Sequence, residues 1–315
     1  MQQRVLFEDS LKWLFARRHD GLSADVRGLA ETLGVSRKRA LQIVERLARL
    51  GLVSRSPEGT IDLTDAGRDE AARIVRVHRL VETFLAEESG LPPEEWHAVA
   101  DRLEHAAGEE EVEQIARRLG NPRFDPHGDP IPTPTGEIEA LPGEPLAGFE
   151  PGSRGRIVHI EDEPHDVYQG LLDRGFELGR QVSIVRDEGA ARVVEIDGRR
   201  EVLSPQAAVN VSLERLSEDE PEERPTRPLS ALKVGETGVV RDIAAACRGL
   251  QRRRLLDLGF VPGSKVTAEF SSPAGDPVAY RVRGTLIALR RDQAALIRIE
   301  PQEVSRPEPV ASVAG

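Results

Sequence analysis

The 315-residue chain has very little of several residue types, and each shortage excludes a class of protein. Its single cysteine, Cys247, excludes an internal disulfide framework and any cysteine-rich zinc site. Aromatic residues make up only 4% of the chain, so its cores must be mostly aliphatic. No apolar run is long enough to cross a bilayer, and Met1 does not open onto a signal peptide. We therefore expect a cytoplasmic protein with no membrane partner.

The charge of the chain is distributed unevenly. A net charge of −11 by itself argues against a nucleic-acid partner. Residues 1–60, however, hold eleven Lys and Arg against seven Asp and Glu. Acidic residues gather instead at 109–111 and within 217–223. Any face that binds nucleic acid is therefore expected within the first 60 residues.

The N-terminal region has the pattern of a winged helix-turn-helix. Residues 8–18 predict a short amphipathic helix. Two further helices follow, joined by a tight turn at Gly34, and the second of them runs from Arg37 to Leu50. Two short extended runs within 52–64 then predict a hairpin, the wing.

This order makes residues 36–42 the start of a recognition helix in the major groove of DNA. Five side chains there suit contacts with bases or phosphates: Ser36, Arg37, Lys38, Arg39 and Gln42. Arginine can bind guanine and glutamine can bind adenine, whereas lysine and serine suit phosphate. Basic residues in a first turn oppose the helix dipole, which weakens a purely structural explanation. We therefore expect double-stranded DNA as a partner.

Histidine and carboxylate side chains recur at helical spacing in the next region. His78 and Glu82 are four residues apart on a helix expected over 64–88. After a Gly-Leu-Pro-Pro break, a second helix is expected to carry His97, Asp101, Glu104 and His105. Imidazoles and carboxylates from two neighbouring helices are typical ligands of divalent first-row metals. The alternative is a solvated polar face, but two such faces in succession, surrounded by apolar residues, favour a metal site.

The C-terminal half contains an internal repeat. The stretch from Leu171 to Gly179 is echoed from Leu255 to Gly263, and a glycine-anchored strand precedes each copy. Short alternating strands follow both copies, which predicts two small β-barrels of about 70 residues each. The Pro- and Gly-rich segment 120–145 predicts an ordered loop and a linker, and the acidic run 217–228 separates the two barrels.

These features together resemble the diphtheria-toxin-repressor family of metal-dependent transcriptional regulators, which includes iron-dependent repressors and manganese transport regulators. The resemblance covers residues 1–140, through the helix-turn-helix, HRLVETFL, HAVADRLEH and the loop PHGDPIP. The two C-terminal copies resemble FeoA-type SH3-like domains, and the second copy, with RRRLLDLGFVPGSKV, is the more similar. A second domain of this type is a departure from the family pattern.

The resemblance implies a multidomain α+β protein. It would have an N-terminal winged helix-turn-helix, an all-α dimerisation domain and two C-terminal SH3-like small β-barrels. The expected boundaries are 1–67 for the DNA-binding domain, 68–142 for the helical metal-binding and dimerisation domain, 143–216 and 226–302 for the two FeoA-type domains, and 303–315 for a disordered tail.

The resemblance also implies the ligands of two metal sites. The regulatory site falls on Asp9, Asp101, Glu104 and His105. An ancillary site falls on His78, Glu82 and His97, completed by a donor from the first SH3-like domain, for which Glu163, His165 and Asp166 are candidates. In the manganese branch of the family the equivalent of His78 serves the main metal cluster instead, and both assignments stay open.

Two departures from the family pattern bear on the choice of metal. The iron branch has Met and Cys sulfurs where this chain has Asp9 and Asp101, and such hard oxygen donors favour Mn²⁺ while leaving Fe²⁺ possible. The manganese branch has a further carboxylate where this chain has Lys12. Because an ammonium cannot bind a metal, we expect one principal regulatory ion rather than a bridged pair. No organic cofactor is expected.

We therefore expect a repressor that uses Mn²⁺ or Fe²⁺ as co-repressor to control metal-homeostasis genes, acting as a homodimer on a palindromic operator. A metal held partly by Asp9 would tether the first helix and favour one orientation of the DNA-binding unit. A metalloenzyme is disfavoured, because the chain has no HExxH motif and no nucleophile constellation. An accessory protein of ferrous iron transport is the remaining alternative, and it would explain only the FeoA-type half.

Overall fold

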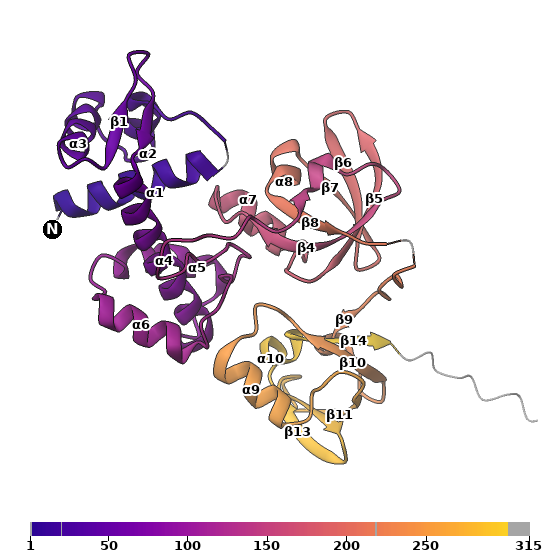
Figure 1. Cartoon of the computed structure of the whole chain (residues 1–315). Helices are drawn as coiled ribbons and strands as arrows, with labels where there is room; N and C mark the ends of the chain where they lie inside the picture. Colours follow the sequence, from indigo (N-terminus) through magenta and orange to yellow (C-terminus); the bar gives the residue numbers. More distant parts are fainter. Residues whose placement is uncertain (1, 20, 218, 302–315) are drawn as a thin grey trace, which may run out of the picture. The chain divides into compact units, whose positions relative to one another are not determined.

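The computed structural model describes residues 2–19, 21–217 and 219–301, which form two compact units (Figure 1). The first unit is built from the chain up to Gly143 together with Val158–Tyr168. The second is built from Glu144–Ile157 and the chain from Gln169 onward. The expected mixed α+β class, with a helical region and two β-sheet domains, is confirmed. The tail expected over 303–315 lies outside the described residues.

The first unit begins with helices and one small sheet. They are α1 (Gln2–His19), α2 (Val26–Thr32), α3 (Arg37–Arg49) and the antiparallel pair β1 (Val53–Arg55) and β2 (Ile61–Leu63). The helix predicted over 8–18 is therefore longer than expected at its N-terminal end. Leu29, Ala40 and Leu47 are fully buried in the aliphatic core that these elements share.

The remaining helices of the first unit are α4 (Asp65–Glu88), α5 (Pro93–Leu103) and α6 (Glu109–Arg118). Their apolar faces pack together around Leu80, Trp96 and Ala100. The Pro- and Gly-rich loop after α6 is ordered, because Ile131 is buried in the same cluster. In the part of the chain that the structure describes, none of the helices combines the length and the apolar character needed to span a bilayer.

The second unit contains two sheets, each with short helices. The first sheet joins β3 (Glu144–Pro145), β8 (Val211–Arg215), β4 (Arg154–Ile160), β5 (Gln181–Glu188), β6 (Ala191–Ile196) and β7 (Arg199–Leu203) in that order, with η1 (Leu146–Gly148), α7 (His165–Leu172) and α8 (Pro205–Val209) along the chain between them. The second joins β9 (Arg227–Pro228), β14 (Ile297–Pro301), β10 (Thr237–Ile243), β11 (Lys265–Ser271), β12 (Val278–Val282) and β13 (Thr285–Leu289), with η2 (Leu229–Ala231), α9 (Gly249–Asp257) and α10 (Arg291–Ala295).

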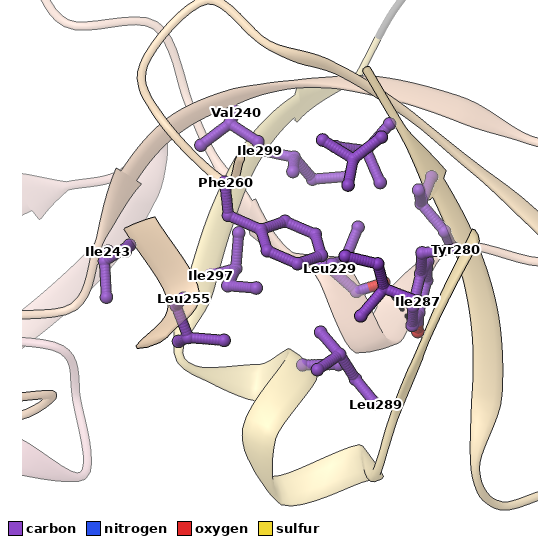
Figure 2. Packing of buried hydrophobic residues seen from close by; sticks show 14 of the residues in the cluster. Leu229, Val240, Ile243, Leu255, Phe260, Tyr280, Ile287, Leu289, Ile297 and Ile299 are labelled. Carbon is purple, nitrogen blue, oxygen red and sulfur yellow. Dashed lines mark hydrogen bonds between the residues drawn. The ribbon is translucent and has the colours of Figure 1, made fainter. Parts of the chain in front are cut away.

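The two sheets have the same strand order when corresponding strands are compared, which is what the internal repeat predicts. Phe176 and Phe260 stand at equivalent positions of the repeat, and both are fully buried. Figure 2 shows Phe260 among the aliphatic side chains of the second sheet, with Tyr280 near Leu229. These aliphatic cores agree with the low aromatic content of the chain.

The acidic run between the two sheets is held against the first sheet rather than left free. Arg154 donates hydrogen bonds to the carbonyl oxygens of Ser217 and Glu220, and Arg156 pairs with the Glu220 carboxylate at 2.6 Å. The backbone N–H of Thr226 donates to Asp197 at 2.7 Å. Residues 217 and 219–228 of this run are therefore held by specific contacts with the first sheet.

The start of α4 packs directly against the backbone of Gly51 and Leu52, which precede β1. Thr64 caps the helix, because its hydroxyl accepts from the Gly67 N–H at 3.0 Å and donates to the Gly51 carbonyl at 2.6 Å. A Cβ on Gly67 would lie only 1.8 Å from the carbonyl oxygen of Leu52. Glycine is therefore required for this close approach between helix and chain.

We predict that Gly67→Ala lowers the free energy of unfolding of the first unit by about 1–3 kcal/mol, because the helix must move away from Leu52. Helix propensity alone would favour alanine by about 1 kcal/mol. Urea unfolding followed by tryptophan fluorescence reports on this unit, since Trp13 and Trp96 are the two tryptophans of the chain. The neighbouring exposed position supplies a control, Ala66→Gly, which should cost no more than about 1 kcal/mol. A more stable Gly67→Ala protein would contradict the argument.

Candidate metal centre

Three groups of histidine and carboxylate side chains lie in the first unit, each close enough together to bind a metal ion. They are Asp9, Glu104 and His105; His78, His97 and Asp101; and Glu82, His127 and Asp162. Within each group, one possible ligand atom per residue lies within 4.8 Å of the others. We refer to them as the Asp9 group, the His78 group and the Glu82 group.

The Asp9 group joins α1 to the turn that follows α5. His105 Nε2 lies 3.6 Å from Asp9 Oδ1 and 3.8 Å from Glu104 Oε1. The other ring nitrogen, Nδ1, lies 2.6 Å from Glu8 Oε2, a contact that the sequence reasoning missed. Glu8 thereby fixes the ring so that Nε2 faces the other two donors, an arrangement common around metal-binding histidines.

The chain leaves helical geometry at the point where this group forms. α5 was expected to continue through His105, but it ends at Leu103, and Glu104 is its C-cap. The N–H of Ala106 bonds to the carbonyl of Leu103, which begins a tighter turn. Glu104 and His105 therefore lie at the end of α5 and in the turn that follows it.

The His78 group lies between α4 and α5. The rings of His78 and His97 are 4.8 Å apart, and Asp101 approaches both, with Oδ1 3.4 Å from His78 Nδ1 and Oδ2 3.5 Å from His97 Nε2. The structure thus places Asp101 with these two histidines rather than with Asp9. His78 also hydrogen-bonds Glu104, which links this group to the Asp9 group.

Lys12 reaches this region from α1. Its Nζ lies 2.6 Å from Asp101 Oδ1, 3.2 Å from Glu104 Oε1 and 3.3 Å from His78 Nδ1. Burial alone would lower the pKa of Lys12, but the carboxylates of Glu104 and Asp101 outweigh it and raise the pKa above its ordinary value. Burial acts to raise the pKa of Asp101 as well. The positive charges of Lys12, His97 and His78 outweigh burial, and the pKa of Asp101 is lowered.

The Glu82 group is the most deeply buried of the three. Glu82 and His127 are 1% and 3% exposed. His127 Nε2 lies 3.4 Å from Glu82 Oε1 and 3.8 Å from Asp162 Oδ2. His97 borders the group as well, with Nδ1 2.8 Å from Asp162 Oδ2.

This group passes a direct test of fit to a metal ion. Glu82 Oε1 and His127 Nε2 are both buried, and neither makes a hydrogen bond to any described residue. Buried polar atoms without a partner are costly, so folded proteins rarely contain them. A cation between these two atoms would satisfy both, and Asp162 supplies a third donor of the kind that divalent metals bind.

The carboxylates of this group stabilise positive charge on the neighbouring imidazoles. Burial lowers the pKa of His97, but Asp162 and Glu82 outweigh it and raise the pKa to about 11. In the same way burial lowers the pKa of His127 and Glu82 overcomes it, raising that pKa to about 10. Without a metal these imidazoles therefore hold protons, and a metal ion must displace them.

The loop that carries His127 packs directly on the segment that carries Asp162. The Asp125 carboxylate accepts hydrogen bonds from the N–H groups of His127 and Asp129, which shapes the turn. Gly128 has φ +95°, and a Cβ there would lie 2.2 Å from the Val158 carbonyl oxygen. The N–H of Ile160 then donates to the His127 carbonyl at 3.0 Å. These contacts bring two distant ligands to one place.

The structure brings the expected ancillary residues together, with Glu82 Oε1 3.6 Å from His97 Nδ1 and Glu82 Oε2 3.9 Å from His78 Nε2. Asp162, which directly precedes the expected donor stretch, faces His97 and His127. Glu163 Oε1 lies 3.7 Å from His97 Nε2 on a side chain that is 74% exposed. His165 and Asp166 are exposed on α7 and belong to none of the three groups. The motif PHGDPIP was the available signal for His127, although its histidine had no assigned role.

The expected DNA-binding residues lie at the start of α3. The Ser36 hydroxyl accepts a hydrogen bond from the Arg39 N–H at 3.2 Å and so caps the helix. The other four side chains are exposed: Arg37, Lys38, Arg39 and Gln42. The opposite face of α3 is buried through Ala40, Ile43, Val44 and Leu47. The helix therefore presents a basic polar surface while its apolar side holds it in the fold.

Comparison with known proteins identifies related families and relatives. Residues 64–133 match the family model described as "Iron dependent repressor, metal binding and dimerisation domain". Residues 144–215 and 227–301 each match the FeoA domain. The iron-dependent repressor IdeR of Mycobacterium tuberculosis is 30% identical over 211 residues, which are 62% of this chain and 90% of that protein. The diphtheria toxin repressor of Corynebacterium glutamicum is 30% identical over 190 residues, 57% of this chain and 83% of that protein.

Solved structures of metal-dependent repressors also match the chain. A manganese-dependent transcriptional repressor in complex with manganese is 32% identical with a TM-score of 0.61, over 66% of this chain and 99% of the other. The IdeR of T. acidophilum is 28% identical with a TM-score of 0.58, over 66% and 97%. The class these matches define is that of metal-dependent transcriptional repressors rather than enzymes. Within that class, the chain belongs to the iron-dependent repressor family that includes IdeR and the diphtheria toxin repressor, as expected from the sequence.

We predict that His127→Ala removes one of the bound Mn²⁺ ions, or weakens it by at least about tenfold, because the Glu82 group loses its imidazole ligand. The measurement is equilibrium dialysis of the full chain against Mn²⁺. His165→Ala is the matched control, since that exposed histidine lies outside the ligand groups, and it should bind as the unchanged protein does. The reverse pattern, with only His165→Ala losing an ion, would reject the Glu82 group.

Proposed function

We propose that this protein is a DNA-binding transcriptional repressor that uses Mn²⁺ or Fe²⁺ as co-repressor to control metal-homeostasis genes. One observation carries the proposal: the Asp9 group takes one donor from α1 and two from the turn after α5. A ligand set divided between these elements can make their relative orientation depend on a metal ion. The family to which the chain belongs supports this function over that of a ferrous-iron transport accessory.

Asp9, Glu104 and His105 would hold the regulatory ion. When bound, the ion supplies positive charge shared by donors from two parts of the fold. Leu11 and Leu14 of α1 are buried in the same core as Ile43 and Leu47 of α3. Packing would therefore transmit a restraint on Asp9 to α3. The ion favours DNA binding only to the extent that it binds the DNA-binding orientation of α3 more tightly than other orientations.

The N-terminal elements would act as a winged helix-turn-helix. In this proposal α3 enters the major groove, with Arg39 and Gln42 against bases and Lys38 against phosphate. The β1–β2 pair is the wing. The match of residues 64–133 to a metal-binding and dimerisation domain supports a homodimer, and two-fold symmetry suits a palindromic operator.

The donor types support Mn²⁺ as the preferred ion, with Fe²⁺ as the alternative. The three ligand groups offer carboxylate oxygens and imidazole nitrogens, which suit hard and borderline divalent ions. The single cysteine of the chain, Cys247, is buried in the apolar core of the second sheet. The Glu82 group would form a second, ancillary site. Relatives include both manganese- and iron-dependent repressors.

The test is a mobility shift of the full chain on DNA from upstream of its own gene, titrated separately with Mn²⁺, with Fe²⁺ under anaerobic conditions, and with Zn²⁺. We expect metal-dependent binding in which Mn²⁺ is at least as effective as Fe²⁺. Arg39→Ala or Gln42→Ala should cost about 1–3 kcal/mol on the operator and relax specificity at one position. Lys38→Ala should weaken binding to all DNA and reduce its salt dependence. Binding that ignores metal, or is unchanged in all three variants, would reject the proposal.

We also predict that Mn²⁺ binding weakens as the pH falls. The pKa of His127, about 10, means that this imidazole of the Glu82 group is protonated in the metal-free protein near neutrality. An imidazole that becomes a ligand must release its proton, so each proton released lowers the affinity by about tenfold per unit decrease in pH. Calorimetry between about pH 6 and pH 8, in buffers of different ionisation enthalpy, measures the number of protons released. An affinity independent of pH would contradict this assignment of ligands.

A further inference from the structure

Lys12 lies inside the metal-ligand cluster. The side chain is only 23% exposed, and its Nζ contacts Asp101, Glu104 and His78 at 2.6, 3.2 and 3.3 Å. These partners come from α4, from α5 and from its C-cap. A single ammonium is therefore surrounded by three groups that could each bind a metal.

The ammonium competes with a metal ion for the same donors. A divalent ion binds carboxylate oxygens at about 2.0–2.3 Å through lone pairs, and those of Asp101 and Glu104 here accept from Lys12. Two cations a few ångströms apart in a partly buried site also repel each other strongly. The position of Lys12 and an ion bound by His78 and Asp101 are therefore mutually exclusive.

The Asp9 group is affected less. Glu104 is the member of the group that Lys12 contacts directly, while Glu8 holds the other ring nitrogen of His105. Glu104 Oε1 lies 3.2 Å from Lys12 Nζ and 3.8 Å from His105 Nε2, and a carboxylate oxygen has two lone pairs, so it can accept from the ammonium and still offer a lone pair to an ion. One ion at the Asp9 group and one ammonium beside His78 can therefore coexist on the shared carboxylate.

We propose that Lys12 is a built-in cation of the regulatory centre. It takes the place of a second ion among His78, Asp101 and Glu104, and it links α1 to α4 and α5 before any metal binds. This inference rests on the proposed function and deepens it by explaining why the chain would bind two metal ions rather than three. It also means that the metal-free protein already has part of the connection between α1 and the following helices.

Removing the positive charge of Lys12 has two measurable consequences. Lys12→Met keeps a side chain of similar length, adds no strong metal ligand and frees His78, His97 and Asp101 to bind a further ion. Without metal, the same change leaves Asp101 and the buried Glu104 without their ammonium partner, so the metal-free protein becomes less stable. Lys12→Glu should enlarge both effects, because it replaces the cation with another carboxylate.

The experiment is equilibrium dialysis of full-length wild-type, Lys12→Met and Lys12→Glu proteins against Mn²⁺. We expect two ions per wild-type chain, at the Asp9 and Glu82 groups, and three in both variants. Lys233→Met, at an exposed lysine in the second unit, is the matched control and should bind two. Urea unfolding followed by tryptophan fluorescence should show both Lys12 variants weakened without metal and recovering with Mn²⁺ more than wild type does.

The outcomes separate this inference from the proposed function. Three ions in the wild type, or an unchanged count in Lys12→Met, would overturn the role of Lys12 while leaving metal-dependent repression intact. A wild-type protein that binds no Mn²⁺ and shifts operator DNA without metal would instead reject the proposed function. If Lys12→Glu does not fold, the comparison of Lys12→Met with wild type still decides the question.

Discussion

The first unit depends on one electrostatic constraint, the concentration of carboxylates between its helices. Asp9, Glu82, Asp101, Glu104 and Asp162 are divided among the three ligand groups, and Glu82 and Glu104 are almost fully buried. Removing a charged carboxylate from water is costly unless a positive partner replaces the water. Lys12 and protonated imidazoles satisfy this demand in the metal-free protein, and divalent ions can satisfy it in their place. The proposed metal sensing rests on this requirement of the fold for cations among the carboxylates.

In the proposed function, the same constraint connects the metal ligands to the elements proposed to bind DNA. α1 carries both Asp9 and Lys12 on one side, and it buries Leu11 and Leu14 in the core shared with α3. Packed aliphatic cores transmit displacements because they contain few voids. In the proposed mechanism, cations at the carboxylate cluster would act on α3 through α1, whose apolar side chains share a core with it.

The parts of this design that follow helical periodicity could be predicted from the sequence, and those that depend on distant loops could not. His78 with Glu82, and His97 with Asp101, are spaced four apart and lie on α4 and α5 as expected. Glu8, His127 and Asp162 come from elements whose meeting is decided by tertiary packing. For His127 the deciding contacts are between its loop and the backbone near Val158. The spacing of residues along the sequence does not predict the contact between these two segments.

Ion pairs join the two sheets of the second unit. Arg298 of the second copy pairs with Glu177 of the first at 2.8 Å, and Arg180 of the first lies 3.8 Å from Asp242 of the second. The positions equivalent to Glu177 and Arg180 in the second copy are Val261 and Ser264. The core positions of the repeat, such as Phe176 and Phe260, are the same in both copies. The charged residues that join the copies are thus those at which the copies differ, so the second domain is an integrated part of this unit and not an interchangeable repeat.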